Sequence, residues 1–438
     1  MTLLLADIAR AGGLLDAVEE ASGQNVFACY QCGKCTAGCP FSLGPQQVVR
    51  LLQLGEVEAA LAHMTTWDCA SCLTCATACP KGVSPTLIHR ALRTLHASPA
   101  AQNGHGGERT NGAALDAPYR AHARPLRTYL FTNIHRLSRL GSAMAPLSNW
   151  ALRVPGANLV AHGLLGIHRA RSLPAFVRRT FPEWFRDHTP LGDGRRGPVA
   201  LFHDTFMDFN FPGTGIAVTE LFEKAGFRVE LADMVCCGRP MISKGLVARA
   251  SVQAETNVTR LWARAREGVP IVGCEPSCLL TLRDEYPAMV PANLRDKARV
   301  VAGQTFLIDE FLAPLAAKGD LDLTFRDSAS GGPSVLFHGH CHQKASAAPA
   351  KSVELLRLAG YRAHMVDASC CGMAGAYGYE KEHYEASRAA GERALFPILR
   401  AHPDAEIAVM GTSCRQQVEH FTGRRTRHVV ELLRAAVD

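Results

Sequence analysis

Two short cysteine runs with the same spacing constrain this chain more than any other feature. The first is CYQCGKCTAGCP at residues 29–40, and the second is CASCLTCATACP at residues 69–80. Sixteen cysteines would suggest disulfides in a small secreted protein, but a chain of 438 residues is long enough to bury several hydrophobic cores. We therefore expect the cysteines to bind metal rather than to pair.

The spacing of each run, C-x2-C-x2-C-x3-C followed by proline, indicates the kind of metal site. Such a loop places three thiolates around one [4Fe-4S] cluster, and its fourth cysteine serves the neighbouring cluster in two-cluster ferredoxins. Zinc sites usually take two separated C-x2-C pairs, and disulfides within such short loops would be strained. The sequence predicts two cubane clusters, the first held by Cys29, Cys32, Cys35 and Cys79, and the second by Cys69, Cys72, Cys75 and Cys39.

The rest of the N-terminal region fits a small helical domain around these clusters. Apolar residues recur at roughly helical spacing between Pro45 and Met64, which predicts a helix there. We expect residues 1–96 to form a helical ferredoxin-like domain with two [4Fe-4S] clusters. Residues 97–119 are rich in glycine and unperiodic, so they are expected to be a flexible linker.

The sequence also bears on the cellular location. It contains no uninterrupted apolar run of about 18 residues, so we expect no membrane span. The opening MTLLLADIAR places Asp7 where a secretory signal would be basic. We expect a cytoplasmic protein, either free or peripheral on the inner face of the cytoplasmic membrane.

Positive charge is concentrated in one segment. The chain carries a net charge of +7, but residues 120–186 contain eleven arginines, no lysine and one acid, Glu183, which gives +10 there and −3 elsewhere. We expect residues 120–190 to form a basic helical connector. One face of its first helix is apolar, formed by Leu126, Leu130, Ile134, Leu137 and Leu140.

Two interpretations of this connector are open. Its leucine face packs on the next domain and leaves the arginines in solvent, or its surface contacts anionic lipid or an acidic partner. The arginines are accompanied by no aromatic ladder or recognition motif, which excludes a nucleic-acid partner.

An internal repeat begins at Pro198. Each copy has the order strand, helix, strand, Cys-Cys-Gly, helix, strand, cysteine, with VALFHDTF and VCCGRP in the first copy and SVLFHGHC and SCCGMAG in the second. This order predicts two α/β units with small, mostly parallel sheets and a pseudo-twofold relation. We expect them at residues 191–325 and 326–438, in a chain that is α+β overall.

Each copy offers four cysteines for a further cluster. Neighbouring side chains of an extended chain point to opposite faces, so a Cys-Cys pair needs a sharp turn to present both sulfurs, and Gly238 and Gly372 permit it. The alternative is that some of these cysteines are structural and bind no metal. The candidates are Cys236, Cys237, Cys274 and Cys278 in the first copy, and Cys341, Cys370, Cys371 and Cys414 in the second.

Three histidines, His338, His340 and His342, flank Cys341 in HGHCHQK. Histidine can ligate iron, but four sulfurs are already available in this copy. We expect these histidines to form hydrogen bonds around the cluster and to tune it.

These residues resemble the CCG-domain iron-sulfur proteins, which are named for the Cys-Cys-Gly of VCCGRP and SCCGMAG. The N-terminal half is similar to the ferredoxin-type subunit of heterodisulfide reductase. The C-terminal half is similar to the catalytic subunit of that enzyme and to iron-sulfur subunits of glycerol-3-phosphate, glycolate and lactate oxidising systems. The resemblance implies one or two further clusters in the repeats, of the cubane or the non-cubane type.

The function expected from this combination is electron transfer. The chain has no G-x-G-x-x-G after a strand, so we expect no intrinsic flavin or NAD, whereas hydride chemistry needs such a cofactor. We expect a subunit that relays single electrons between a flavoprotein dehydrogenase and a quinone or another carrier, with residues 120–186 contacting a membrane surface or the partner. The alternatives are a catalytic subunit resembling heterodisulfide reductase and a scaffolding or sensing module, and we assign no catalytic residue.

Overall fold

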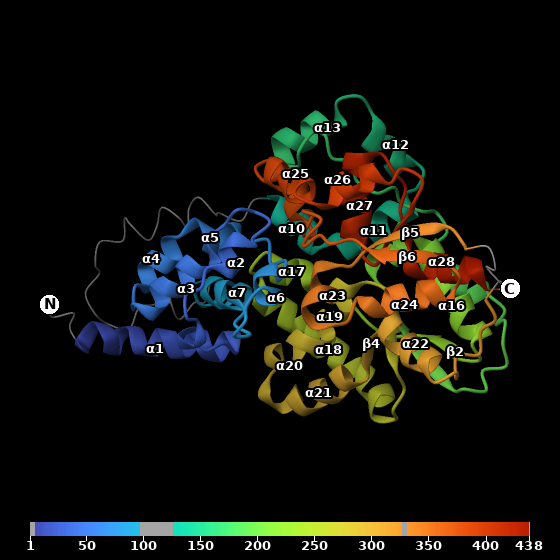
Figure 1. Ribbon diagram of the computed structural model, residues 1–438, viewed down its shortest axis with the longest axis horizontal. Coiled ribbons are helices and arrows are strands. Elements are labelled where there is room, and N and C mark those ends of the chain that lie inside the picture. The colour runs from blue at the N-terminus through green and yellow to red at the C-terminus, as the bar shows by residue number, and fades with distance from the viewer. Residues whose placement is uncertain (1–4, 97–125, 326–330, 438) are drawn as a thin grey trace. The chain divides into compact units, whose positions relative to one another are not determined.

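The computed structural model of this chain describes residues 5–96, 126–325 and 331–437 (Figure 1). These residues form two compact units. The first comprises residues 1–129 with 242–247, and the second comprises residues 130–241 with 248–438. The expected linker at residues 97–119 lies outside the described residues. No helix within the described ranges has the length and apolar character needed to cross a membrane.

Every regular element in the described residues 5–96 is a helix. Its core is formed by apolar side chains of α1, α3, α4 and α7, among them Val18, Val49 and Leu92. The helix expected between Pro45 and Met64 is instead two helices, because the chain turns at Leu54 and Gly55, where Gly55 has φ +78°. The helices are α1 (Leu5–Ser22), η1 (Val26–Ala28), α2 (Lys34–Ala37), α3 (Pro45–Gln53), α4 (Val57–Ala62), α5 (Met64–Asp68), α6 (Thr74–Thr77) and α7 (Pro85–His96).

The second unit contains two four-stranded sheets, which confirms the prediction of two α/β repeats. Both sheets are entirely parallel, and they have the equivalent orders β2-β1-β3-β4 and β6-β5-β7-β8. The first sheet comprises β1 (Pro198–Phe202), β2 (Arg228–Leu231), β3 (Ile271–Gly273) and β4 (Thr305–Leu307). The second comprises β5 (Ser334–His338), β6 (Arg362–Met365), β7 (Glu406–Val409) and β8 (Arg427–His428).

Helices accompany both sheets. Those of the first repeat are α15 (Thr205–Phe209), α16 (Pro212–Lys224), α17 (Arg239–Ser243), α18 (Val247–Arg266), α19 (Pro276–Leu280), η3 (Thr281–Glu285), α20 (Tyr286–Met289), η4 (Ala292–Leu294), α21 (Arg295–Gly303) and α22 (Ile308–Ala317). Those of the second are α23 (Cys341–Ser346), α24 (Ala350–Leu358), η5 (Tyr377–Tyr379), α25 (Tyr384–Glu392), α26 (Leu395–Ala401), α27 (Thr412–Thr422) and α28 (Val429–Ala436).

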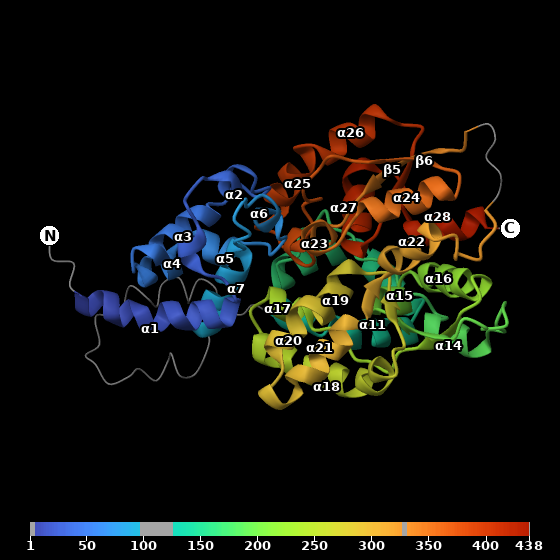
Figure 2. The same cartoon turned by 60° about the horizontal axis from the view of Figure 1, so that its bottom comes forward.

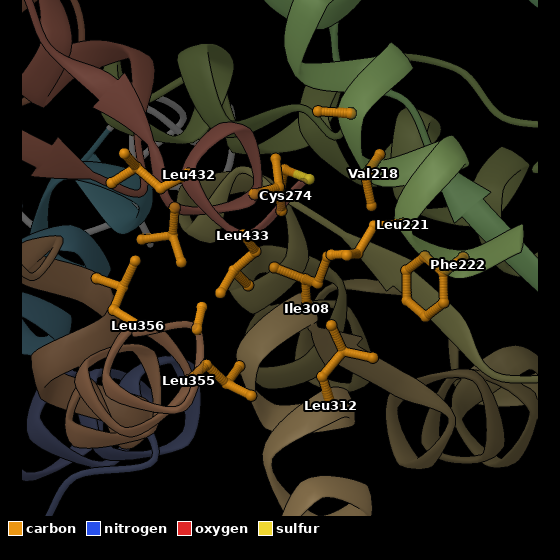
Figure 3. Close-up of a cluster of buried hydrophobic side chains, with 14 of the residues drawn as sticks. Val218, Leu221, Phe222, Cys274, Ile308, Leu312, Leu355, Leu356, Leu432 and Leu433 are labelled. Atoms are coloured by element: carbon orange, nitrogen blue, oxygen red, sulfur yellow. The ribbon is translucent and has the colours of Figure 1, made fainter. Parts of the chain in front are cut away.

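The two repeats share one hydrophobic core. Alternate residues of β1 point to opposite faces, so Val199 and Leu201 enter this shared core while Ala200 and Phe202 enter a second one. In the same way Val335 of β5 enters the shared core. Helices α16 and α28 pack together, as do α22 and α24, and leucines from all four fill the shared core (Figures 2 and 3). The repeats therefore fold as one body.

The basic connector contains α10 (Leu126–Thr132), α11 (Ile134–Ala143), α12 (Leu147–Arg153), α13 (Ala157–Val160), η2 (Ala161–Leu165) and α14 (Phe181–Asp187). The apolar face expected there packs only in part, because Leu130 and Ile134 are half-buried whereas Leu126, Leu137 and Leu140 are exposed. In α11 the buried residues are Ser138 and Ser142, and Ser142 Oγ donates to the carbonyl oxygen of Val177, whereas Leu137 and Leu140 are 37% and 58% exposed. Small hydroxyl side chains face the protein, and leucines face outward.

Candidate iron-sulfur centres

The two N-terminal cysteine runs have the same backbone conformation. In the first run Gln31 and Gly33 have φ of +64° and +75°, and in the second Ser71 and Leu73 have φ of +55° and +60°. Left-handed conformations cost free energy in residues other than glycine, and they persist where the surrounding structure imposes them. Both loops are therefore held in the same unusual shape, each followed by one turn of helix, α2 or α6.

The electrostatic contacts of these cysteines fall into two groups. Burial raises the pKa of the Cys69 thiol, and the neighbouring sulfurs of Cys72 and Cys39 raise it further. A hydrogen bond to Cys32 raises the pKa of Tyr30, and so do the charges of Cys79 and Cys29. The fourth cysteine of each run thus lies near the other run's first cysteines. This arrangement fits the predicted exchange of ligands, which stays a prediction.

In the first repeat, three of the four candidate cysteines come together. The sulfur atoms of Cys237 and Cys278 lie 3.0 Å apart, and Cys236 interacts with the thiol of Cys237. Gly238 follows the pair with φ +81°, which is the turn that the sequence predicted after the two cysteines. Cys237 and Cys278 lie in the same core cluster.

Cys274, the fourth candidate of the first repeat, lies elsewhere. Its side chain is 2% exposed and packs in the core shared by the two repeats, beside Leu433 and Val218 (Figure 3). Burial raises the pKa of its thiol, and the carboxyl group of Asp204 adds to the shift. Cys274 directly follows β3 and lies in the same core cluster as Val272, whereas Cys237 and Cys278 lie with Ile271 in the cluster on the other face of the sheet.

The pseudo-twofold relation explains this placement. Glu275 and Gly411 are the N-cap residues of α19 and α27, so Cys278 and Cys414 occupy the same third position of equivalent helices. By the same count Cys274 corresponds to Met410, which is also a residue of the shared core. Cys274 therefore occupies the position of an ordinary apolar core residue.

In the second repeat the thiols converge around Cys371. Hydrogen bonds with Cys370 and Cys414 hold the pKa of Cys371 below its usual value. The ligand atoms of His338, Cys371 and Cys414 all lie within 4.8 Å of one another. Cys341, at the start of α23, is 8% exposed, and the other three cysteines are 1–3% exposed. This group is a buried pocket of sulfur.

The histidines of HGHCHQK differ in their environments. His338 is fully buried, neither of its ring nitrogens has a hydrogen-bond partner, and burial lowers its pKa to about 4. His340 caps α23, where its Nδ1 accepts a hydrogen bond of 3.2 Å from the backbone N–H of His342. An orphaned, neutral imidazole beside two thiols is a fitting donor to a bound sulfur or a fitting ligand to a metal.

Gly372 fixes the loop that carries Cys370 and Cys371. Its φ is +96°, and a Cβ at this position would lie 2.1 Å from the carbonyl oxygen of Ser387. Only glycine combines that conformation with that approach. The Cys-Cys-Gly loop therefore rests directly on α25.

The charges around the two repeats differ. Near the first, burial and the neighbouring Glu275 raise the pKa of Asp204 to about 7. Near the second, the Nζ atom of Lys344 donates to the carbonyl oxygens of Ala368 and Ser369, and it interacts with the cysteines of the repeat. The carboxyl group of Asp204 thus lies near the first group of thiols, and a cation accompanies the second.

The donor sets fit iron-sulfur clusters. None of the sixteen cysteines takes part in a disulfide, and most are buried or half-buried in groups. Burial raises the pKa of several of these thiols, among them Cys35 and Cys69, and each thiol must lose its proton to bind metal. Sulfur-rich groups of this kind suit iron-sulfur clusters better than hard cations.

Sequence reasoning missed one charged residue beside these groups. Arg171 belongs to the basic connector, yet it is only 6% exposed and interacts with Cys371. Its neighbours are far away in the sequence, at residues 378, 387 and 417. An arginine among eleven in one segment carries no signal that it is buried.

Comparisons with known proteins match these features of the fold. The 4Fe-4S dicluster domain matches residues 28–83, and the cysteine-rich domain CCG matches residues 199–283 and 335–419. The first match contains both cysteine runs. The two others each contain a Cys-Cys-Gly pair and most of one sheet.

Several curated proteins are similar over long stretches. A subunit of the anaerobic glycerol-3-phosphate dehydrogenase of Escherichia coli is 28% identical over 323 residues, which cover 71% of this chain and 77% of that protein. D-2-hydroxyglutarate dehydrogenase of Pseudomonas putida is 29% identical over 251 residues, which cover 57% of this chain but 23% of that protein. Lactate utilization protein A of a Geobacillus species is 26% identical over 147 residues, covering 33% of this chain and 57% of that protein.

Proposed function

We propose that this chain, a CCG-domain iron-sulfur protein with an N-terminal 4Fe-4S dicluster domain, is the electron-transfer subunit of a flavin-dependent dehydrogenase. The observation that carries the proposal is the grouping of the cysteine thiols. Two groups lie in the dicluster domain, and one lies in each cysteine-rich domain. Several metal centres in one chain form a relay rather than a single active site.

The ligand sets follow from these groups. We assign Cys29, Cys32, Cys35 and Cys79 to one cubane cluster, and Cys69, Cys72, Cys75 and Cys39 to the other. In the cysteine-rich domains we assign Cys341, Cys370, Cys371 and Cys414 to the second domain, and Cys236, Cys237 and Cys278 to the first. When bound, clusters at these sites would accept and release single electrons. The protein itself holds the sulfur atoms together and shields them from water.

The partner follows from what the chain lacks and from what its relatives are. Oxidation of an alcohol removes two electrons at once, and the sequence offers no nucleotide fingerprint that would bind a cofactor for this step. Two of the similar proteins are named as part of a dehydrogenase and as a dehydrogenase. A flavin can take two electrons and return them singly, so a flavoprotein dehydrogenase is the fitting donor.

The connector supports a membrane surface as the place where electrons leave to a quinone. Half of the exposed large apolar side chains in the described ranges, eleven of twenty-two, lie between Leu137 and Leu173. Trp150 and Leu164 are 65% and 74% exposed. This stretch contains four arginines, of which Arg171 is buried, and no acid. Exposed tryptophan and leucine beside arginine fit an anionic bilayer surface, where apolar side chains insert and arginines meet phosphate.

The experiment that tests the relay uses the whole protein, purified without oxygen. The reduced protein, prepared with limited dithionite, is mixed with a short-chain quinone, and the recovery of visible absorption is followed. We expect reoxidation through a one-electron route and a slower rate in Cys75→Ser, which breaks the chain of centres. A reduced protein that transfers no electron to a quinone or to a one-electron dye would contradict the proposal.

One observation favours a second candidate, disulfide reduction. In the first repeat three thiols gather while Cys274 stays in the core, so a metal bound there would lack a fourth thiolate and could meet a substrate sulfur. Dye-reduced protein incubated with a mixed disulfide decides between the two. Release of thiols at a rate comparable with quinone reduction would favour the disulfide reductase.

A further inference from the structure

Arg171 is a buried cation without an anionic partner. Its side chain belongs to the connector and is 6% exposed, and its Nη1 atom has no hydrogen-bond partner. Among the described residues, no carboxylate lies within ion-pair distance of it. A buried guanidinium is costly unless its charge is compensated. No carboxylate of the described residues supplies that compensation, which leaves the nearby thiol of Cys371 and whatever it binds.

The position of Arg171 is fixed by neutral groups. Nε donates to the carbonyl oxygen of Gly378 over 2.7 Å, and Nη2 donates to Ser387 Oγ over 3.0 Å and to Gln417 Oε1 over 2.8 Å. Ser387 and Gln417 are fully buried. These contacts hold the guanidinium without neutralising it.

The same two residues hold the cluster site. Gln417 lies on α27, three residues after Cys414, and a Cβ on Gly372 would approach both the Ser387 carbonyl oxygen and Gln417 Nε2 within 3 Å. Arg171 therefore contacts the helix that carries Cys414 directly, and Ser387 and Gln417 lie between it and the Cys-Cys-Gly loop. The sulfur of Cys371 is close enough to favour the charged form of Arg171, although burial lowers its pKa.

Aromatic rings enclose the remaining side of Arg171. Its Cζ lies 4.8 Å from the ring centroid of Phe421, 5.2 Å from that of Tyr384 and 5.8 Å from that of Tyr379. Burial and Arg171 itself lower the pKa of the nearby His420 to about 4, so this histidine is neutral. The cage keeps water away from the charge and leaves its field unscreened.

The first repeat has no equivalent among its described residues. There the buried Arg239 pairs with Glu285, with 2.5 Å between Nη1 and Oε1, so its charge is compensated locally. The carboxyl group of Asp204 lies near the thiols instead. The unpaired arginine is therefore specific to the second cysteine-rich domain.

We propose that Arg171 is a positioning residue whose fixed charge stabilises the reduced state of the cluster held by the second cysteine-rich domain. This inference rests on the proposed function. A tetrathiolate cluster is anionic and gains one more negative charge on reduction, so a nearby unscreened cation favours the electron. The second domain thereby becomes the site where the electron is held more tightly.

The test is a redox titration of the whole protein, followed by low-temperature EPR. The signal of the second domain is identified as the one missing from Cys371→Ala. In Arg171→Gln we expect the ratio of reduced to oxidised cluster, at a fixed potential, to fall at least tenfold, which is about 59 mV for one electron. Gln417→Glu places a carboxylate against Nη2 of Arg171, so the ratio of reduced to oxidised cluster should fall in this variant too. The midpoints of the N-terminal clusters should not move.

Two controls separate charge from structure. Arg169→Gln removes an exposed charge of the same connector and should leave the midpoint unchanged, whereas Arg171→Lys keeps a charge at the same position and should keep the midpoint closer to that of the wild type than Arg171→Gln does. If Arg171→Gln cannot retain iron, Gln417→Glu carries the test. A loss of iron with an unchanged midpoint of the remaining cluster would make Arg171 purely structural and overturn the inference. Absence of every EPR signal from the wild type would instead overturn the proposed function.

Discussion

The sulfur atoms of Cys237 and Cys278 lie 3.0 Å apart, although 41 positions separate the two residues in the sequence. Cys274, four residues before Cys278, points into the core shared by the repeats. In the first repeat three cysteine thiols therefore lie together, and the fourth cysteine packs in the hydrophobic core.

This division predicts opposite results for two alanine variants. Cys278→Ala should lose the iron bound by the first cysteine-rich domain, because it removes one of the three gathered thiols. Cys274→Ala should keep that iron and lower the free energy of unfolding by about 1 kcal/mol, as expected for a small cavity in a core. Iron analysis and urea unfolding measure the two effects. Equal loss of iron in both variants would show that Cys274 is also a ligand.

The exchange of fourth ligands in the dicluster domain gives a second prediction. Cys39→Ala should abolish the EPR signal that Cys75→Ser also abolishes, because both residues are assigned to the same cluster. Cys79→Ala should instead abolish the signal lost in Cys35→Ser. If Cys39→Ala and Cys35→Ser remove the same signal, each run keeps its own four ligands and the assignment is wrong.

Asp309 gives a prediction for the pH dependence of stability. Ser352 Oγ and Gln343 Nε2 donate to one of its oxygens, but burial raises its pKa from 3.8 to about 6. The folded state therefore binds this proton more tightly than the unfolded state. Its contribution to stability is present at low pH and is lost as the pH rises through about 6, with a cost at neutral pH of about 3 kcal/mol.

Asp309→Asn removes that cost. Above pH 6 we expect the free energy of unfolding of the variant to exceed that of the wild type by about 2 kcal/mol, because asparagine offers one acceptor oxygen in place of two and loses about 1 kcal/mol of hydrogen bonding. The difference should shrink as the pH falls toward 5. The matched control is Asp296→Asn, because the Asp296 side chain is 93% exposed and the exchange should change little. A difference that is independent of pH would show that the carboxyl group of Asp309 is not the cause.

The outward leucine face predicts binding to anionic vesicles. Sedimentation with vesicles of phosphatidylcholine and phosphatidylglycerol should recover the protein. Replacing Leu147, Trp150 and Leu164 by serine should weaken binding at least about tenfold, because each loses the burial of one large apolar side chain. Arg139→Gln with Arg153→Gln should weaken it mainly at low salt. Equal binding to neutral vesicles, or none to either kind, would favour a protein partner for this face.

Much of the architecture was predictable because its signals are local or repeated. The C-x2-C-x2-C-x3-C spacing predicts grouped thiols within a dozen residues, and the two Cys-Cys-Gly pairs align the repeats without any knowledge of the structure. The parallel order of both sheets follows from the alternation of strand and helix. These features follow from the spacing and order of residues along the chain, which can be read from the sequence.

The rest depends on the direction in which a side chain points. Helical spacing identified the leucine face of α11, but this spacing does not tell whether the face points into the protein or toward solvent. In the structure Ser138 and Ser142 are the buried residues of α11, so its leucines face outward. Cys274 and Cys278 look equivalent in the sequence, yet β3 and α19 point them to different cores. Arg171 became notable only when residues more than 200 positions away were placed around it.

The central claim is that these thiols hold iron and inorganic sulfide. The most direct measurement is the iron, sulfide and zinc content of protein prepared without oxygen, together with the EPR spectrum after reduction with dithionite. We predict a brown protein with at least eight irons and eight sulfides per chain, about four of each for every cubane cluster, and reduced-cluster signals. A colourless protein, or one loaded with zinc and free of sulfide, would contradict the account.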